Sequence, residues 1–376
     1  MNKLETFIRQ TAFSRPTLVL DVDQVEENYK KLKKGLGTAH IHYAVKANPQ
    51  KEILERLVYL GSRFDAASMG EIILCIDAGA KPEHISFGNT VKRVEDIKYA
   101  YMCGIRLFSV DSVEEVYKVA QHAPGSDVFV RILVHDTEAE WPLSKKFGCD
   151  KGMAVNVFEA AKTHGLNPIG ISFHIGSQTR HPEMWDNTLI SMADIWHMIS
   201  GLGHNLTMLN IGGGFPAYYG KDITAADKYA EYLVNAVKTH FGDVEYIMAE
   251  PGRGMVGNAG YMAATVLLVS QKSNTDTQRW VYLDVGKFSG LAETDEEAIK
   301  YQFIVPDKDG DPESEKFVMA GPTCDSADVL YTEHKVTLPK SIEPGDKIIV
   351  KNCGAYTTTY STIAFNGFPP LEVIVI

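Results

Sequence analysis

Eight short strand-like runs alternate with segments of helical period between residues 41 and 250, and this alternation constrains the fold most. The runs lie at residues 41–45, 62–66, 85–87, 105–109, 128–134, 169–174, 206–211 and 245–250. Helix-period stretches lie at residues 50–60, 70–78, 94–102, 113–122, 153–164, 182–199 and 225–241. Eight strands separated by helices predict a closed parallel (β/α) eight-stranded barrel of the TIM type, with functional groups at the carboxyl ends of its strands.

From residue 261 onward the sequence shows no helical period and is rich in strand-like runs. Strand-like runs lie at residues 263–269, 279–284, 316–319, 334–338, 347–351 and 371–376. The short run at residues 17–20, which precedes the first barrel helix, is expected to join this all-β part. The sequence therefore predicts an α/β plus β protein, with a barrel domain over residues 24–260 and a β-sandwich or barrel-like domain from residues 1–23 and 261–376.

Length, charge and cysteine content limit the classes of function. A chain of 376 residues is longer than one ordinary core, which agrees with two domains. Its formal net charge of -11 disfavours nucleic acid or an anionic membrane as a partner, because either favours a basic face. No apolar run reaches the roughly 18 residues of a membrane span. Five cysteines without paired or metal-type spacing predict reduced thiols, no metal site and a cytoplasmic location.

Lys46 is the most informative single residue. It follows the apolar run His42-Tyr43-Ala44-Val45, so the strand delivers one lysine to the point where it ends. Burial beside that run would free its amine to attack an aldehyde. A lysine at a strand end is more often a solvated cap, so the chemistry depends on which other groups reach the same edge.

Reactive groups end several other predicted strands. Asp65 ends the second strand, Arg131 lies in the fifth, His174 ends the sixth, the Gly212-Gly213-Gly214 triplet follows the seventh and Glu250 ends the eighth. A lone histidine is usually structural, and a glycine triplet is usually a tight turn. Because the carboxyl ends of barrel strands meet at one rim, we expect these side chains to converge.

Together these groups suit one cofactor. Gly213 and Gly214 let backbone N–H groups approach a phosphate, while Arg253 and Ser177 add side-chain donors. Glu250 could keep a pyridine nitrogen protonated, and the imidazole of His174 could lie on the ring. With Lys46 for an aldehyde, the set describes pyridoxal 5'-phosphate.

At this point the sequence resembles the barrel-type (fold type III) pyridoxal phosphate amino acid decarboxylases over nearly its whole length, and within them the branch that acts on ornithine. The motifs that carry the resemblance are Tyr43-Ala44-Val45-Lys46-Ala47-Asn48, Phe64-Asp65-Ala66-Ala67-Ser68, His174-Ile175-Gly176-Ser177, Gly212-Gly213-Gly214-Phe215-Pro216, Glu250-Pro251-Gly252-Arg253, Gly321-Pro322-Thr323-Cys324-Asp325-Ser326-Ala327-Asp328, Cys353-Gly354-Ala355-Tyr356-Thr357 and Phe365-Asn366-Gly367-Phe368.

The resemblance implies roles for individual residues. Lys46 would form the Schiff base with the cofactor, and Tyr356 would be a further phosphate ligand. The supporting shell around the cofactor would be Asp65, Glu71, Arg131 and His174. A head-to-tail homodimer is also implied, with active sites at the interface.

The dimer would bring further residues to each site. Cys324 and Asp325 would reach in from the partner subunit. Cys324 is then the candidate acid that returns a proton to Cα after loss of carbon dioxide, although a small buried hydrophobe is the alternative.

The substrate is inferred from charge. Asp325 and the acidic segment Glu293-Thr294-Asp295-Glu296-Glu297 could hold a distal ammonium group, which suits ornithine, with putrescine as the product in polyamine biosynthesis. The segment could instead be a solvated helix start. Lysine, or both substrates, is the second choice.

Other activities fit less well. The resemblance to diaminopimelate decarboxylases is weaker, because their pattern has a glutamate after the cysteine and an arginine in the segment that corresponds to the one after Asp284. Here Asp325 follows Cys324, and residues 284–300 contain no arginine. Only Gln178 matches their pattern. A racemase and a catalytically dead regulatory homologue remain further options. The second should have lost the lysine, the glycine triplet or the cysteine, and none is lost.

Overall fold

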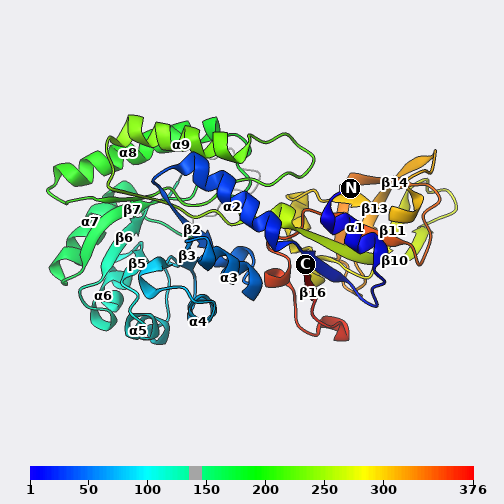
Figure 1. Cartoon of the computed structure of the whole chain (residues 1–376), viewed down its shortest axis with the longest axis horizontal. Coiled ribbons are helices and arrows are strands. Elements are labelled where there is room, and N and C mark those ends of the chain that lie inside the picture. The colour runs from blue at the N-terminus through cyan, green and yellow to red at the C-terminus, as the bar shows by residue number, and fades with distance from the viewer. Residues whose placement is uncertain (135–145) are drawn as a thin grey trace. The chain divides into compact units, whose positions relative to one another are not determined.

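The computed structural model describes residues 1–134 and 146–376 (Figure 1). These residues form two compact units. The barrel unit comprises Glu26–Pro216 and Ile223–Gly254, and the β unit comprises Met1–Val25, Ala217–Asp222 and Met255–Ile376.

Parallel strands close the predicted barrel in chain order. Within the described residues the eight strands are β2 (His40–Ala44), β3 (Arg63–Ala66), β4 (Ile85–Phe87), β5 (Leu107–Val110), β6 (Asp127–Arg131), β7 (Asn167–Ser172), β8 (Met208–Asn210) and β9 (Tyr246–Ala249). The last strand pairs with the first through His40 and Met248, which closes the ring. The predicted (β/α) eight-stranded barrel is confirmed, but the predicted run at 128–134 ends as a strand at Arg131.

Helices connect the barrel strands and lie outside them (Figure 1). The connecting helices are α3 (Lys51–Tyr59), α4 (Met69–Asp77), α5 (Val94–Met102), α6 (Val113–His122), α7 (Lys151–Thr163), α8 (Asp186–Gly201) and α9 (Ala226–Phe241), with the short 3-10 helices η1 (Val45–Ala47), η2 (Pro82–His84) and η3 (Pro182–Trp185). The helix α2 (Val22–Leu36) precedes β2, and α10 (Arg253–Val256) follows β9. Side-chain caps begin several of them: Ser68, Ser112 and Asp150 each accept an N–H from the first turn. Such caps fix where a helix begins after a strand.

The barrel interior changes from apolar to polar along its axis. Phe129, Met208 and Met248 form a buried cluster, against which Leu107, Ile169 and Tyr246 pack. Strand side chains alternate with a period of two, so Arg131, Asn210 and Glu250, each two residues further on, share the interior face. Hydrophobic groups therefore fill part of the amino half of the barrel interior, and ionisable groups gather at the carboxyl end.

The β unit is one mostly antiparallel sheet. Its strands within the described residues are β1 (Thr17–Leu20), β10 (Gly260–Gln271), β11 (Arg279–Leu283), β12 (Gln302–Ile304), β13 (Ser314–Ala320), β14 (Val329–Pro339), β15 (Lys347–Lys351) and β16 (Glu372–Val375), in the order β12-β15-β10-β11-β13-β14. Short 3-10 helices connect them, namely η4 (Gly257–Ala259), η5 (Lys287–Ser289), η6 (Ala292–Glu297), η7 (Pro306–Lys308), η8 (Thr358–Tyr360) and η9 (Phe365–Gly367). As expected, β1 joins this unit, antiparallel to β10 and parallel to β16.

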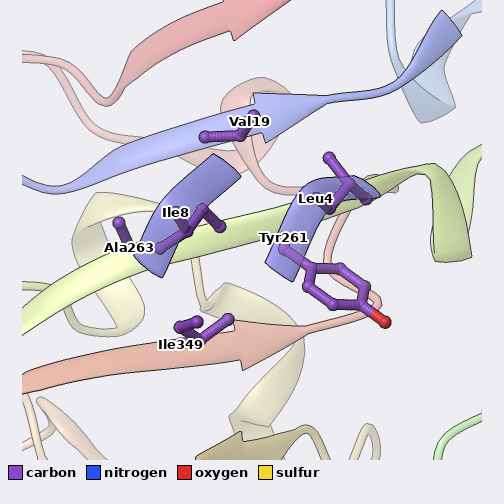
Figure 2. Packing of buried hydrophobic residues seen from close by; sticks show 6 residues of the cluster. All are labelled: Leu4, Ile8, Val19, Tyr261, Ala263 and Ile349. Carbon is purple, nitrogen blue, oxygen red and sulfur yellow. The ribbon is translucent and has the colours of Figure 1, made fainter. Parts of the chain in front are cut away.

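A helix that the sequence analysis did not identify covers part of this sheet. It is α1 (Lys3–Gln10), and its Leu4 and Ile8 are buried against Val19, Tyr261 and Ile349, together with Ala263 (Figure 2). Residues four apart lie on one helix face, which explains the packing. The three-residue strand β12 was also missed. Among the described residues, no helix is long and apolar enough to cross a membrane.

Candidate active site

Lys46 lies in η1, directly after β2. The turn is held by the Tyr43 hydroxyl, which donates to the carbonyl of Asn48 at 2.9 Å. Tyr43 is fully buried, whereas Lys46 is exposed. The strand therefore anchors the turn and presents the lysine at the rim, but the burial that we expected for its side chain is not found.

Glu250 follows β9 and is held by Asn210 from the neighbouring strand. The Asn210 Nδ2 group donates to Glu250 Oε1 at 2.6 Å, and Asn210 is 1% exposed. Burial raises the pKa of Glu250, while the bond from Asn210 and the positive charges of Lys46 and Arg131 oppose that rise. Asn210, Lys46 and Arg131 thus stabilise the ionised carboxylate of Glu250. A protonated pyridine nitrogen requires an ionised carboxylate as its partner.

Asp65, in β3, is a second carboxylate at the same rim. It is buried, and its pKa is raised well above the usual range by burial and by the negative charge of Glu250. A Cβ on Gly88 would lie 1.8 Å from Asp65 Oδ1, so the carboxylate occupies the space that a side chain there would fill. Asp65 and Glu250 thus lie close enough for the protonation of one to affect the other.

Arg131 and His174 complete the ionisable groups of the rim. Burial lowers the pKa of Arg131, and the carboxylates Glu250 and Asp65 oppose this. Burial, and then the charges of Arg131 and Lys46, hold the pKa of His174 well below its usual range, so the imidazole is neutral. The Gly176 N–H donates to His174 Nδ1 at 3.0 Å, which leaves the proton on Nε2.

The glycine triplet forms a tight turn against this histidine. Gly212 has φ +72°, and a Cβ there would lie 2.0 Å from the carbonyl oxygen of Phe173. A Cβ on Gly213 would lie 2.9 Å from His174 Nε2. Hydrogen bonds from the Gly212 N–H to Asn210 Oδ1 and from the Glu250 N–H to the Gly212 carbonyl, both at 2.8 Å, fix the turn to the neighbouring strand.

Arg253 and Ser177 lie together beside the turn. The Arg253 guanidinium donates to Ser177 Oγ through Nε at 3.4 Å and through Nη2 at 3.3 Å. Arg253 is only 3% exposed. A buried guanidinium next to a hydroxyl and to glycine backbone is a suitable set of donors for a phosphate.

The remaining predicted site residues belong to the β unit. Tyr356 has φ +54°, and its ring centroid lies 5.8 Å from that of Tyr360. Cys324 is exposed, and its backbone N–H donates to Asn366 Oδ1 at 3.0 Å. Asp325 is also exposed, and its Oδ1 accepts the Ala327 N–H at 2.9 Å. The loop that carries Cys324 and Asp325 is thus held by its own hydrogen bonds.

The acidic segment is not the solvated helix start that was one interpretation of the sequence. The backbone kinks at Asp295 and Glu296 within η6, and Glu293 is only 5% exposed. Glu297 accepts the backbone N–H groups of Thr332, Glu333 and His334, each at 2.7 Å. Burial of Glu293 and the contacts of Glu297 with β14 make this a packed connection.

The residues at the barrel rim fit pyridoxal phosphate. The glycine turn leaves no room for a Cβ, Arg253 and Ser177 are grouped beside it, and buried carboxylates lie at the same end as Lys46. In such an arrangement the turn and Arg253 would hold the phosphate, Glu250 the ring nitrogen, and Lys46 the aldehyde carbon. Within the described parts of the chain, no group of three or more His, Cys, Asp or Glu residues could hold a metal ion.

Several residues of the site were not found by sequence reasoning. Asn210 supports both Glu250 and the glycine turn, and Gly88 makes room for Asp65. Glu71, in contrast, was already named through the family resemblance, and its carboxylate accepts the Ala67 N–H at 2.7 Å, which ties the start of α4 to the end of β3. A signal for Asn210 did exist, because it lies two residues before Gly212 and is the polar member of an apolar strand.

Comparisons with known proteins agree with this geometry. The family described as "Pyridoxal-dependent decarboxylase, pyridoxal binding domain" matches residues 22–257. The lysine/ornithine decarboxylase of Selenomonas ruminantium is 34% identical over 357 residues, which cover 94% of this chain and 87% of that protein. A crystal structure of an SrLDC mutant in complex with pyridoxal phosphate has a TM-score of 0.88 at 31% identity, covering 100% of this chain and 95% of that one. For lysine/ornithine decarboxylase from Vibrio vulnificus complexed with putrescine, the TM-score is 0.85 at 29% identity, with coverage of 99% and 96%.

Proposed function

Because the chain belongs to the pyridoxal-dependent decarboxylases, we propose that it decarboxylates L-ornithine and releases putrescine. Membership of this family shows that the protein is a pyridoxal phosphate-dependent amino acid decarboxylase that acts on a small molecule. The family resemblance read from the sequence is thereby confirmed. The choice of ornithine is the proposal.

The proposal rests on the position and exposure of Asp325. It is an exposed carboxylate directly after Cys324, in a loop that hydrogen bonds from Cys324 to Asn366 and from Ala327 to Asp325 hold in place. A carboxylate of this kind suits the distal ammonium of a basic amino acid. Glu293 is a weaker candidate, because it is buried within the β unit.

Lysine is the second candidate, favoured by the names of the relatives. The protein from Selenomonas ruminantium is a lysine/ornithine decarboxylase, and so is the one from Vibrio vulnificus that was solved with putrescine. Ornithine and lysine differ by one methylene, which a pocket discriminates by about 1–3 kcal/mol. We therefore propose that lysine is a slower substrate. Diaminopimelate is disfavoured because residues 284–300 carry no arginine for its second carboxylate.

The roles proposed for the site residues follow from their positions. Bound pyridoxal phosphate supplies the electron sink for the charge left at Cα when carbon dioxide departs. Lys46 would hold the cofactor's aldehyde carbon, and Glu250 would keep a proton on the ring nitrogen. His174, neutral, would lie on the ring, and Tyr356 would bind phosphate. Cys324 would return the proton to Cα.

We also propose a homodimer that completes each site. The loop that carries Cys324 is exposed in the single chain, and so are the apolar side chains that follow it in the C-terminal segment: Ile363 is 84% exposed, Tyr360 51% and Phe368 37%. Exposed apolar groups of this kind mark surfaces that bind another protein. The partner subunit's Cys324 and the partner subunit's Asp325 would then face the substrate. Free cysteine thiols support a reducing, cytoplasmic compartment.

The experiment is a substrate survey with the purified protein. Ornithine, lysine, arginine and diaminopimelate are supplied separately with pyridoxal phosphate, and the amine products are identified by mass spectrometry. The proposal predicts putrescine as the fastest product and slower formation of cadaverine. Diaminopimelate as the best substrate would contradict it.

The role of Asp325 has its own test. In the proposed dimer the partner subunit and the substrate would enclose Asp325 and its ammonium partner. Truncating one partner of such a buried charged pair costs about 2–5 kcal/mol, so Asp325→Asn is expected to lower kcat/KM for ornithine by on the order of a hundredfold or more. The exposed neighbour Ser326 provides the control, Ser326→Ala, which should be near wild type. Equal kcat/KM values for the two variants would remove Asp325 from the substrate site.

A further inference from the structure

A chain of hydrogen bonds runs through the barrel interior from its amino end to its catalytic rim. The Tyr246 hydroxyl lies 2.9 Å from His42 Nε2, and His42 Nδ1 lies 3.2 Å from Ser86 Oγ. Ser86 Oγ lies 3.5 Å from Asp65 Oδ1. The groups come from β9, β2, β4 and β3, so the chain exists only because the barrel brings these strands together.

The middle of this chain is closed to solvent, and its outer end is not. His42 is 1% exposed and Ser86 is fully buried. Tyr246, in contrast, lines a cavity of about 360 Å³ at the amino end of the barrel, together with Arg63, Asp127 and others. Tyr246, the outer member of the chain, is therefore part of the cavity wall, whereas the inner end of the chain meets Asp65 at the opposite end.

Each interior member of the chain can both donate and accept a proton. Burial, and then the positive charge of Arg63 with smaller contributions from His40 and His84, hold the pKa of His42 well below its usual range, so its ring carries one proton. Burial raises the pKa of Tyr246, which therefore stays a hydroxyl. A neutral imidazole has one donor and one acceptor nitrogen, so a chain through it has a direction.

That direction depends on Asp65. When Asp65 is ionised, Ser86 donates toward it, His42 Nδ1–H donates to Ser86, and Tyr246 donates to Nε2. When Asp65 is protonated, it donates to Ser86, Ser86 donates to Nδ1, and His42 Nε2–H donates to the Tyr246 oxygen. The carbonyl oxygen of Phe64, 3.3 Å from Ser86 Oγ, is a second acceptor for the serine proton only in the ionised arrangement.

We propose that Tyr246, His42 and Ser86 form a proton relay, in which the tautomer of His42 follows the protonation state of Asp65. In one direction the Asp65 proton moves to Ser86, the serine proton to Nδ1, the Nε2 proton to Tyr246, and the tyrosine proton to water in the cavity. Asp65 loses one proton, the solvent gains one, and every other group keeps its number. The reverse sequence reprotonates Asp65.

The relay has a use in this reaction. Decarboxylation consumes one proton per turnover, because an amino acid and a proton yield an amine and carbon dioxide. Asp65 lies among charged groups at the rim, namely Glu250, Lys46, Glu71 and Arg131, whose fields act on it. A proton route from the amino end would let Asp65 gain or lose a proton when these charges change, without water entering at the rim. His42 is in this sense a positioning residue and touches no substrate.

The tautomer can be measured directly. The protein, with its cofactor bound, is labelled with ring-15N histidine, and the nitrogen chemical shifts are recorded between about pH 5 and 9. These shifts distinguish the two neutral tautomers from each other and from the charged ring. His42→Phe identifies the signal by its disappearance. The expected result is a change from Nε2–H at low pH to Nδ1–H at high pH, with no charged ring, and a constant tautomer in Asp65→Ala.

A neighbouring histidine supplies the matched control. His40 stacks on the Tyr246 ring, with centroids 4.3 Å apart and planes at 9°, but takes no part in the chain. His40→Phe should leave the pH-dependent change of His42 intact. A His42 tautomer that is constant in the wild type, a ring that becomes charged, or a change that persists in Asp65→Ala would each overturn the proposal.

Discussion

Asn210 Nδ2 donates a 2.6 Å hydrogen bond to Glu250 Oε1, while Asn210 Oδ1 accepts the N–H of Gly212. One buried amide therefore connects the carboxylate proposed for the ring nitrogen to the glycine turn proposed for the phosphate. The two ends of the cofactor site are set by a single side chain, and its removal should affect both.

Asn210→Ala is expected to shift the acid limb of activity to higher pH. The bond from Asn210 lowers the pKa of Glu250, so its loss raises that pKa and keeps the carboxyl protonated over a wider range. A hydrogen bond to a charged group contributes about 1.5–3 kcal/mol, which corresponds to a roughly ten- to hundredfold fall in kcat/KM at neutral pH. The measurement is the pH profile of kcat/KM, with the exposed Asn235→Ala as control. An unshifted acid limb would contradict the role of Asn210.

Gly88→Ala is expected to displace Asp65. The added Cβ would lie 1.8 Å from Asp65 Oδ1, so either the carboxylate or the β4 loop must move. Overpacking of this kind destabilises by about 1–3 kcal/mol. Thermal unfolding and cofactor affinity are measured beside Gly201→Ala, where a Cβ meets nothing within 4 Å. Equal cofactor affinity in the two variants would show that the position of Asp65 does not matter.

The barrel and most of its rim could be predicted because the signals are local. Strand period, helix period and a reactive residue at a strand end are all visible in short windows. The support for those residues is not local: Asn210 and Glu250 are 40 residues apart, and Ser86 reaches Asp65 only through the register between β3 and β4. The acidic segment was open to misinterpretation for the same reason, because the partners of Glu297 lie in β14, more than 30 residues away.

Glu297→Gln is expected to destabilise the fold in a pH-dependent way. Burial would raise the pKa of Glu297, but N–H donors from Glu333, His334 and Thr332 outweigh it, and the pKa is lowered from 4.5. A carboxyl with a lowered folded-state pKa stabilises above its unfolded pKa, and this contribution is lost as pH falls through the folded value. The Tm difference from wild type should therefore be largest near neutral pH and shrink below about pH 4. Glu333→Gln, at an exposed neighbour, is the control; an equal Tm loss there, or a loss that grows in acid, would contradict this.

Mixed dimers test whether sites are shared. If Lys46 and the partner subunit's Cys324 act in one site, two inactive variants, Lys46→Ala and Cys324→Ala, should complement each other on mixing. Random pairing makes half of the dimers mixed, and each of these has one intact site, so activity should recover to about a quarter of wild type. Subunit exchange is verified by mass spectrometry of the intact dimer. Exchange without recovery would mean that each site is built within one chain.

Lys46 is proposed to hold pyridoxal phosphate at the barrel rim. The direct measurement is reduction of the purified, cofactor-bound protein with borohydride, followed by peptide mass spectrometry. We expect one pyridoxyl group per chain on Lys46, loss of near-visible absorption on reduction, and neither signal in Lys46→Ala. The variant Lys51→Ala, at an exposed lysine, should behave as wild type. A label on any other lysine, such as the buried Lys92, or a protein that takes up no cofactor, would contradict it.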